Sequence, residues 1–517
     1  MIKNKYNTSI FIASLFLLSC ADTDIVSNLD EGVIESSKIV LTSEEFVSIA
    51  YDSPRELTLE EISNVVLNFQ HNIKGREITT RSSKSPKVAI KKKFYISEND
   101  NVINTSATTR LSMSEELTIP IFEVELFSDD GEKNLAIVCG DERVPEVLFY
   151  INNYNSKIKF DNGTRYLLEL SKKNILSDIQ QVEYIKSAKK DSTLYKIARQ
   201  LNVPKNRIVF DDIKDKIITT DETSTRNYNP GNQSGGESRP TSNIVGFVNP
   251  MSKVLWDQGY PYNYFMPVMM IYDDHAGEHE ANINVGCANI AIGTLFSIIK
   301  PSMSLDNGEK VDWNYVTSVE EIYGIPGWPG YGSPQDLVDM ISGLLAQIAT
   351  ATASEPFYEE KELLDINTET KYKKSVITQT TTTTINTVNY LKSMVNLSGD
   401  QNTKFNGNLA KQSLFKRNPV FLCGQGHILD TNGNIVRAGG GHAWLIDGVV
   451  ITKQPRQTEC DHYWSVNMGW GVGSKAYFRT SNNLQNCDVV FPYSEKEKEN
   501  IAYYTQEMTM LYNITKK

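Results

Sequence analysis

The chain has 517 residues, which is too long for one ordinary hydrophobic core, so we expect at least two domains. Hydrophobic residues make up 40% of the sequence and aromatic residues 10%, a composition that excludes global disorder. The formal net charge of −11 argues against nucleic-acid binding, because that function requires a basic surface.

The N-terminus has the pattern of an export signal. Lys3 and Lys5 precede an apolar run over residues 10–18 that is too short to span a bilayer permanently. The run ends in Leu-Leu-Ser-Cys, which resembles a bacterial lipobox, where the cysteine, here Cys20, is lipidated and becomes the mature N-terminus. We therefore expect a signal peptide over 1–20 and an exported protein anchored by lipid to the bacterial outer membrane or cell surface, with release after maturation left open. An ordinary signal peptide that contains a cysteine is the alternative.

Residues 41–218 are predicted to form an α+β domain, after a polar tether over 21–40. Thr58 and Glu61 have the spacing of a capping box, and the apolar i, i+3, i+4 pattern behind them indicates a helix. Strand-like alternation follows in "KVAIKKKFYI", "TIPIFEVELF" and "KNLAIVCG". The stretch "SDDGEKN" between the last two is typical of a hairpin turn.

Residues 219–243 separate this domain from the rest of the chain. They are rich in Gly, Pro, Ser, Thr and Asn and have almost no apolar side chains, so they cannot bury enough surface to fold. We interpret them as an exposed, cleavable linker. The alternative, a single surface loop, would be unusually long.

Residues 244–517 are predicted to form a second α+β domain. Helical patterns come first, and strand patterns dominate from about residue 418 onward. The threonine-rich run "QTTTTTINT", over 379–387, is interpreted as a solvated connection between elements.

Cys287 is the first candidate for chemistry. It follows a glycine and begins an apolar helical pattern, and the free N–H groups of a helix N-terminus favour a thiolate. His442 follows three glycines, which allow another backbone or a substrate to approach closely, and precedes an apolar strand. A cysteine at a helix start with a histidine on a strand some 155 residues later is the arrangement of papain-like thiol enzymes. A structural cysteine and an incidental hairpin histidine are the alternatives.

Neither a metal nor a cofactor is expected. His275 and His279 stand among carboxylates in "DDHAGEHEAN", but this run lacks the helical context of HExxH and a third ligand at motif spacing. The six cysteines include no CxxC pair, and Cys460 with Cys487 is a candidate disulfide in an exported chain.

Five stretches of the second domain resemble, in order, the motifs of streptopain-type cysteine peptidases of the papain-like clan. They are "WDQGYPYN", "GCANIAIGTLFSIIKP", "VDWNYV", "NPVFLCGQ" with "GGGHAWLIDGV", and "VNMGWGVGSKAYF". The resemblance implies a papain-like fold with a helical part and an antiparallel β part. It also implies four catalytic residues: Cys287 as nucleophile, His442 as general base and acid, Gln258 as a donor in the oxyanion hole, and Asn467 as the residue that orients the histidine ring.

Three further residues are expected to bind substrate or shield the site: Trp470, Gly440 and Gly441. Trp470 would cover the contact between histidine and asparagine, although plain core packing is the alternative for this side chain. The family commonly has Trp directly after the asparagine, and here the residue is Met468, which fills space but supplies no N–H donor.

The first domain carries a resemblance of its own. "LAIVCGDERVPEVLFY" is similar to a stretch of the family's propeptide, which implies an inhibitory prodomain over 41–218 and a maturation zone in the linker. A permanent accessory domain is the alternative. Together these expectations describe an exported, lipid-anchored cysteine endopeptidase made as a zymogen, with protein or peptide substrates, the propeptide as inhibitor and the membrane as partners. An acyl-transferring thiol enzyme of transglutaminase or ligase type, and a catalytically idle surface binding protein, are the rival hypotheses.

Overall fold

The computed structural model describes residues 38–74, 87–97, 102–103, 118–127, 133–154, 162–220, 243–273, 277–324, 331–365, 370–429, 435–453, 460–480 and 502–517. The expected signal peptide with Cys20, most of the expected tether and linker, His275 and Cys487 lie outside these ranges. Within them, no helix is long and apolar enough to cross a membrane.

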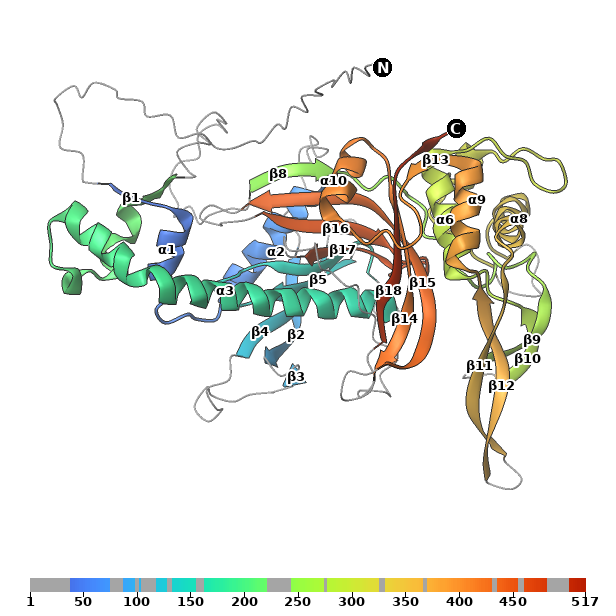
Figure 1. Ribbon diagram of the computed structural model, residues 1–517, viewed down its shortest axis with the longest axis horizontal. Coiled ribbons are helices and arrows are strands. Elements are labelled where there is room, and N and C mark those ends of the chain that lie inside the picture. The colour runs from blue at the N-terminus through green and yellow to red at the C-terminus, as the bar shows by residue number, and fades with distance from the viewer. Residues whose placement is uncertain are drawn as a thin grey trace, which may run out of the picture.

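The N-terminal region combines a long helix with antiparallel strands (Figure 1). Its helices are α1 (Ser43–Ala50), α2 (Leu59–Lys74), α3 (Asn162–Leu201) and α4 (Phe210–Ile213), with short 3-10 turns at Lys205–Arg207 and Lys214–Lys216. Its strands are β1 (Ile39–Leu41), β2 (Lys87–Ser97), β3 (Val102–Ile103), β4 (Thr118–Phe127), β5 (Lys133–Cys139), β6 (Val147–Ile151) and β7 (Ile217–Thr219).

The predicted capping box is confirmed at the start of α2. The Glu61 carboxylate accepts a hydrogen bond from the Thr58 backbone N–H at 2.8 Å, and the Thr58 hydroxyl accepts one from the Glu61 N–H at 3.3 Å. A second capping box, between Thr42 and Glu45, begins α1.

In the part of the C-terminal region that the structure describes, three strands between residues 243 and 282 precede the first helix, so the predicted order of helices before strands is wrong there, whereas strands dominate from Val420 onward as predicted. Its helices are α6 (Cys287–Ile299), α7 (Trp313–Val316), α8 (Gln335–Ala351), α9 (Thr384–Met394) and α10 (Gly407–Phe415). Its strands are β8 (Asn243–Val248), β9 (Val268–Asp273), β10 (Gly277–Asn282), β11 (Glu355–Asp365), β12 (Thr370–Thr381), β13 (Val395–Ser398), β14 (Val420–Leu429), β15 (Ile435–Lys453), β16 (Asp461–Asn467), β17 (Lys475–Thr480) and β18 (Ala502–Lys516). The α+β class expected from the sequence is confirmed.

One large antiparallel sheet runs through both regions. Its strand order is β13-β18-β14-β15-β16-β17-β6-β5-β4-β2-β3, and β8 also pairs with β15. The two regions join where β6 pairs with β17, with Tyr150 opposite Tyr477 and Phe149 opposite Phe478. This one sheet therefore contains strands from before and after the expected linker.

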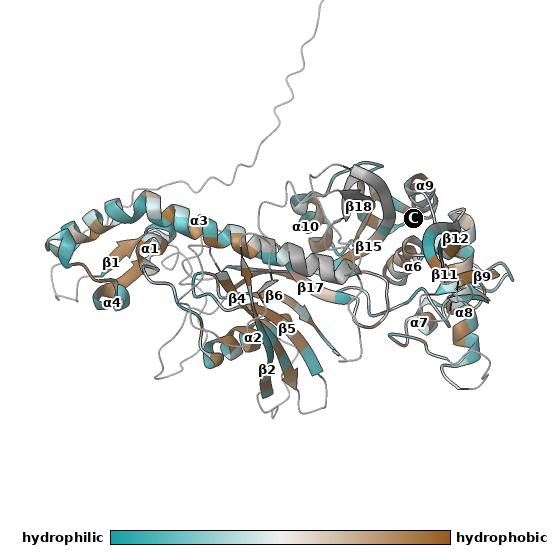
Figure 2. Cartoon of the chain, turned by 90° about the horizontal axis from the view of Figure 1, so that it is seen from below, coloured by the Kyte–Doolittle hydropathy of each residue, from teal (hydrophilic) through white to brown (hydrophobic). Residues whose placement is uncertain are grey.

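Two hydrophobic clusters bury the two faces of this sheet. On one face, Ile175 and Ile179 of α3 pack in a cluster that includes Phe149 and Trp464. On the other face, Phe69 of α2 packs in a cluster that also draws residues from β5, β6, β15, β16 and β17. Figure 2 shows α2 and α3 beside the strands of the N-terminal region, coloured by hydropathy. Each cluster contains residues from both regions, so the two regions pack together on each face of the sheet.

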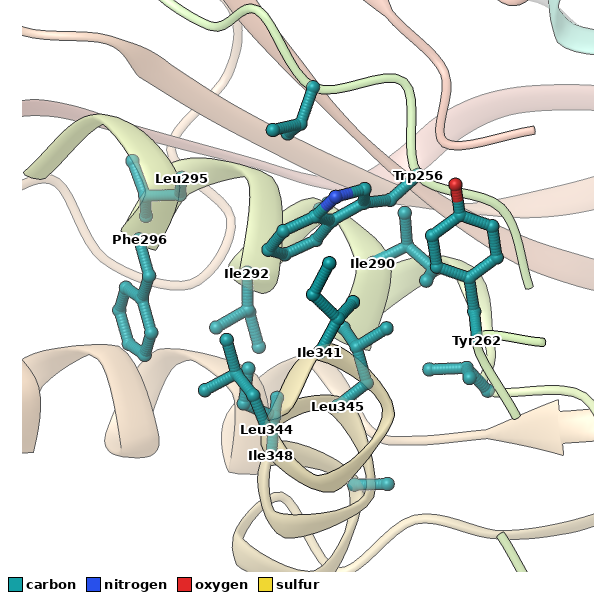
Figure 3. Packing of buried hydrophobic residues seen from close by; sticks show 14 of the residues in the cluster. Trp256, Tyr262, Ile290, Ile292, Leu295, Phe296, Ile341, Leu344, Leu345 and Ile348 are labelled. Carbon is teal, nitrogen blue, oxygen red and sulfur yellow. The ribbon is translucent and has the colours of Figure 1, made fainter. Parts of the chain in front are cut away.

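A third cluster fills the helical part of the C-terminal region. Trp256 lies against Ile290 of α6 and Ile341 and Leu345 of α8 (Figure 3). Ile290, Ile341 and Leu345 are fully buried. This packing fixes α6 against the sheet, and with it the position of the helix N-terminus.

Candidate active site

Helix α6 begins at Cys287, as the sequence predicts. Its N-cap is Gly286, with φ of 92°, a left-handed backbone conformation that favours glycine. A Cβ at this position would lie 2.9 Å from the Thr380 backbone oxygen, which is closer than real contacts allow. Glycine is therefore needed here both for the backbone angle and for the close approach of β12.

The Cys287 sulfur faces the backbone of β15. Its Sγ lies 3.9 Å from the Gly441 carbonyl oxygen, to which the thiol donates. The Ala443 backbone hydrogen bond to the sulfur lowers the thiol pKa, but burial outweighs it and the pKa of Cys287 is raised above its usual value. In this structure the thiol is therefore protonated at neutral pH.

His442 stands between Gly441 and Ala443, the two residues whose backbone groups contact the Cys287 sulfur. Its ring is buried and nearly parallel to two tryptophan rings, Trp444 and Trp470, with centroids 6.0 Å away in both cases and interplanar angles of 14° and 5°. Burial lowers the pKa of His442 to about 4, and a hydrogen bond to the Met468 backbone opposes this shift only in part. The imidazole is therefore neutral at neutral pH.

Cys287, Gly441 and His442 line one pocket. The pocket is bounded by the start of α6, by β14 and β15, and by the end of β12, where Gln379 and Thr381 contribute. The structure thus brings together the candidate nucleophile, the candidate base and one of the two candidate glycines; Gly440 precedes Gly441 in β15. A thiol beside an imidazole can attack the carbonyl carbon of a peptide bond while the imidazole accepts the thiol proton.

Gln258 lies beside the segment that leads into α6. Its backbone oxygen accepts a hydrogen bond of 3.0 Å from Val285, two residues before Cys287. The Gln258 side chain is buried, and its Nε2 has no hydrogen-bond partner among the described residues. It does not line the pocket shared by Cys287 and His442.

Asn467 occupies the end of β16 and is buried. Its Nδ2 donates to the Val254 oxygen at 3.1 Å, and its Oδ1 accepts from the Gly469 N–H at 3.0 Å. The side chain thus holds the turn that contains Met468 and Trp470. The backbone of Met468, rather than the Asn467 amide, supplies the hydrogen bond that acts on the His442 pKa.

Two contributors to the pocket were not singled out as site residues from the sequence. The first is the end of β12, because a run of threonines has no period that points to a site. The second is Cys423, a buried free thiol on β14 whose pKa is raised to about 12, mainly by burial. Its place opposite Ala443 follows from the register of β14 and β15, which local sequence does not reveal.

No metal centre accompanies the thiol and the imidazole in the part of the chain that the structure describes. No three His, Cys, Asp or Glu side chains there are grouped so as to hold an ion. His279 lies on β10, and its Nδ1 is 3.1 Å from the Gly277 oxygen.

A thiol at a helix N-terminus beside a strand histidine is the arrangement of papain-like thiol enzymes. Residues 256–478 match the model of the Peptidase C10 family, and this range contains every expected catalytic residue. This match confirms the expected streptopain-type resemblance and identifies the matched part of the chain as a cysteine-type peptidase.

Two solved structures from Prevotella intermedia are similar to the chain at 14% identity. A mutant fragment of prointerpain A covers 76% of this chain and 96% of its own length, with a TM-score of 0.37. The active wild-type interpain A cysteine protease covers 53% of this chain and 96% of its own length, with a TM-score of 0.32. No curated protein matches the chain significantly.

Proposed function

We propose that this protein is an exported, lipid-anchored cysteine endopeptidase made as a zymogen, with Cys287 and His442 as its catalytic pair. The observation that carries the proposal is that both side chains line one pocket at the N-terminus of α6. Protein or peptide chains are the substrates, as the match to a peptidase family supports.

Cys287 attacks the scissile carbonyl and forms the acyl-enzyme, while His442 takes the thiol proton and returns it to the leaving amine. The buried Nε2 of Gln258 is a donor without a partner among the described residues, so it is suited to join the Cys287 N–H in stabilising the oxyanion. Such a donor contributes about 3 kcal/mol to transition-state stabilisation. Asn467 orients the histidine through the turn that it holds, and Trp470 shields the ring. Gly440 and Gly441 leave room for the substrate backbone.

The proposed zymogen requires a change in the protonation of the catalytic pair. Burial raises the Cys287 pKa and lowers the His442 pKa, so both groups are neutral in the full chain. A reactive thiolate–imidazolium pair requires both shifts to be reversed. We assign the propeptide to 41–218 and the maturation zone to 219–243. Strand β6 of the N-terminal region pairs with β17, and β17 is the neighbour of β16, the strand that carries Asn467. The packing of the N-terminal region can therefore affect the position of residues in the site.

Replacement of the nucleophile tests the peptidase. Purified Cys287→Ser is expected to lose casein hydrolysis completely and to keep its original N-terminus under reducing conditions, whereas the wild type acquires a new terminus within 219–243. Cys460→Ser, at a half-buried cysteine outside the pocket, is the matched control and is expected to behave as the wild type under the same reducing conditions. Casein hydrolysis by Cys287→Ser at the wild-type rate would refute the proposal.

The lipid anchor is tested separately. Cells that express the wild type and are fed a radiolabelled fatty acid should label the protein, and Cys20→Ala should abolish the label and release the protein from the membrane fraction. Labelling of Cys20→Ala at the wild-type level would exclude Cys20 as the anchor.

A further inference from the structure

The threonine-rich run forms one wall of the candidate catalytic pocket. Residues 379–381 end β12, and residues 379–382 line the pocket together with Gly286 and Cys287. The interpretation of this run as a solvated connection is therefore wrong for residues 379–381, which belong to β12. Thr380 is buried, with 6% of its surface exposed, and its backbone oxygen faces Gly286.

Three hydroxyls in the run hold this wall in place. Thr380 Oγ1 donates to the Asn284 oxygen at 2.5 Å, and Thr382 Oγ1 donates to the Thr352 oxygen at 2.7 Å. The Thr383 hydroxyl caps α9 by accepting from the Asn386 N–H at 3.3 Å. These bonds tie the end of β12 to the segment before Cys287, to the end of α8 and to α9, so the wall is rigid.

Two polar side chains of the wall are available to hydrogen-bond a ligand. Gln379 is half-buried and Thr381 is exposed, and both line the pocket. Neither side chain has a hydrogen-bond partner within the described ranges, in contrast to Thr380, Thr382 and Thr383.

The backbone explains why these two residues reach the pocket. In the β11–β12 hairpin, Phe357 pairs with Gln379 but Tyr358 pairs with Ile377, so Thr378 is an extra residue in β12. Such a bulge increases the local twist and redirects the side chains that follow it. Phe357, on the paired strand, lines the pocket as well.

We propose that Gln379 and Thr381 determine specificity by hydrogen-bonding a polar, uncharged side chain of the substrate within two residues of the scissile bond. This inference rests on the proposed peptidase function of Cys287 and His442. The amide of Gln379 donates and accepts, and the hydroxyl of Thr381 does the same, so Ser, Thr, Asn and Gln side chains satisfy both. An aliphatic side chain in this pocket would remove water from both groups without replacing its hydrogen bonds, which disfavours it.

The test measures kcat/KM for peptides in which the two positions on each side of the cut carry Gln, Ser, Leu or Val. The processed wild-type enzyme is expected to prefer Gln or Ser over Leu or Val at one of these positions. Gln379→Leu and Thr381→Val should each lower this preference about two- to tenfold, the effect of one net hydrogen bond. Thr381→Ser, which keeps the hydroxyl, should retain it.

Thr378→Val is the matched control, because it makes the same change in the same strand outside the pocket lining. An apolar preference at every position, or an unchanged preference in both Gln379→Leu and Thr381→Val, would overturn the inference while the peptidase stands. Absence of any cleavage that depends on Cys287 would overturn the peptidase and the inference together.

Discussion

Phe149 of β6 and Phe478 of β17 lie opposite each other on neighbouring antiparallel strands, with ring centroids 5.2 Å apart. Both rings are fully buried. This pair joins the N-terminal region to the sheet that carries the candidate active site. The same junction holds two clusters of shared apolar side chains, one on each face. Contact of this kind is typical of a single packed unit rather than of two domains that touch only at their surfaces.

The junction predicts that cleavage of the chain does not separate its halves at once. With a foreign protease site inserted near residue 230, the cut Cys287→Ser protein should elute from a sizing column as one species without denaturant. Phe149→Ala removes a buried aromatic ring, a change that costs about 3–5 kcal/mol, so the cut variant should dissociate at lower denaturant concentration.

Phe127→Ala provides the control, since this ring ends β4 and is 39% exposed. Elution of the cut parent protein as two separate fragments in buffer would contradict the prediction.

A buried ionic cluster at the same junction predicts a dependence of stability on pH. Arg479 of β17 pairs with Asp178 of α3 at 2.8 Å and with Asp461 of β16 at 2.6 Å. Tyr463 donates to the Glu146 carboxylate at 2.6 Å. Burial raises the pKa of Glu146 well above its usual value, and the neighbouring Asp461 raises it further.

Glu146 therefore stays protonated in the folded protein after it has ionised in the unfolded chain. From about pH 4 upward the unfolded state gains stability from this ionisation, so the free energy of unfolding falls until the folded carboxyl also ionises. Glu146→Gln removes this loss, because the amide can accept from Tyr463 and donate to Asp461 without ionising. Thermal unfolding should show the variant more stable than the wild type at pH 7 and no more stable at pH 4. An equal difference at both pH values would argue against a raised pKa.

The sequence was sufficient to predict the local features on which the site depends. Glycine before Cys287 and an apolar helical period after it predict the start of α6, and the glycine-flanked strand pattern predicts β15 with His442. The pairing of β6 with β17 depends on which strand edges meet, and no local pattern encodes that choice. The place of Gln379 and Thr381 beside Cys287 likewise follows from a hairpin bulge and long-range packing.

Gly286 gives a sharp test of the geometry at the helix start. Gly286→Ala forces a left-handed angle on alanine, which costs about 1–3 kcal/mol, and pushes against the Thr380 oxygen. Displacement of Cys287 by about 1 Å should lower kcat/KM about 100-fold. Gly308→Ala is the matched control, because Gly308 has φ of +84° with no atom within 4 Å of the new Cβ. Gly308→Ala should add backbone strain without a steric contact, so the enzyme should keep full activity. An equal loss of activity in both variants would contradict the role of the Thr380 contact.

The protonation state of the full chain predicts a slow thiol. Because burial raises the Cys287 pKa, alkylation of the unprocessed protein by iodoacetamide should be slower at pH 7 than alkylation of a free cysteine, and its rate should rise with pH to 9 and beyond. Tandem mass spectrometry locates the adduct and distinguishes Cys287 from Cys460, the other half-buried cysteine in the described residues. A rate that is already maximal at pH 6 would show that the thiolate exists before processing.

The most direct measurement of the catalytic assignment is the intact mass of the processed enzyme after reaction with a peptidyl epoxide. The account predicts one adduct per molecule, located on Cys287, with loss of all casein hydrolysis. It also predicts that His442→Ala slows adduct formation at pH 7 by at least about 100-fold, since no base then removes the thiol proton. Unchanged adduct formation in His442→Ala, or complete inactivation with the adduct on a different residue, would contradict the pairing of this sulfur with this imidazole.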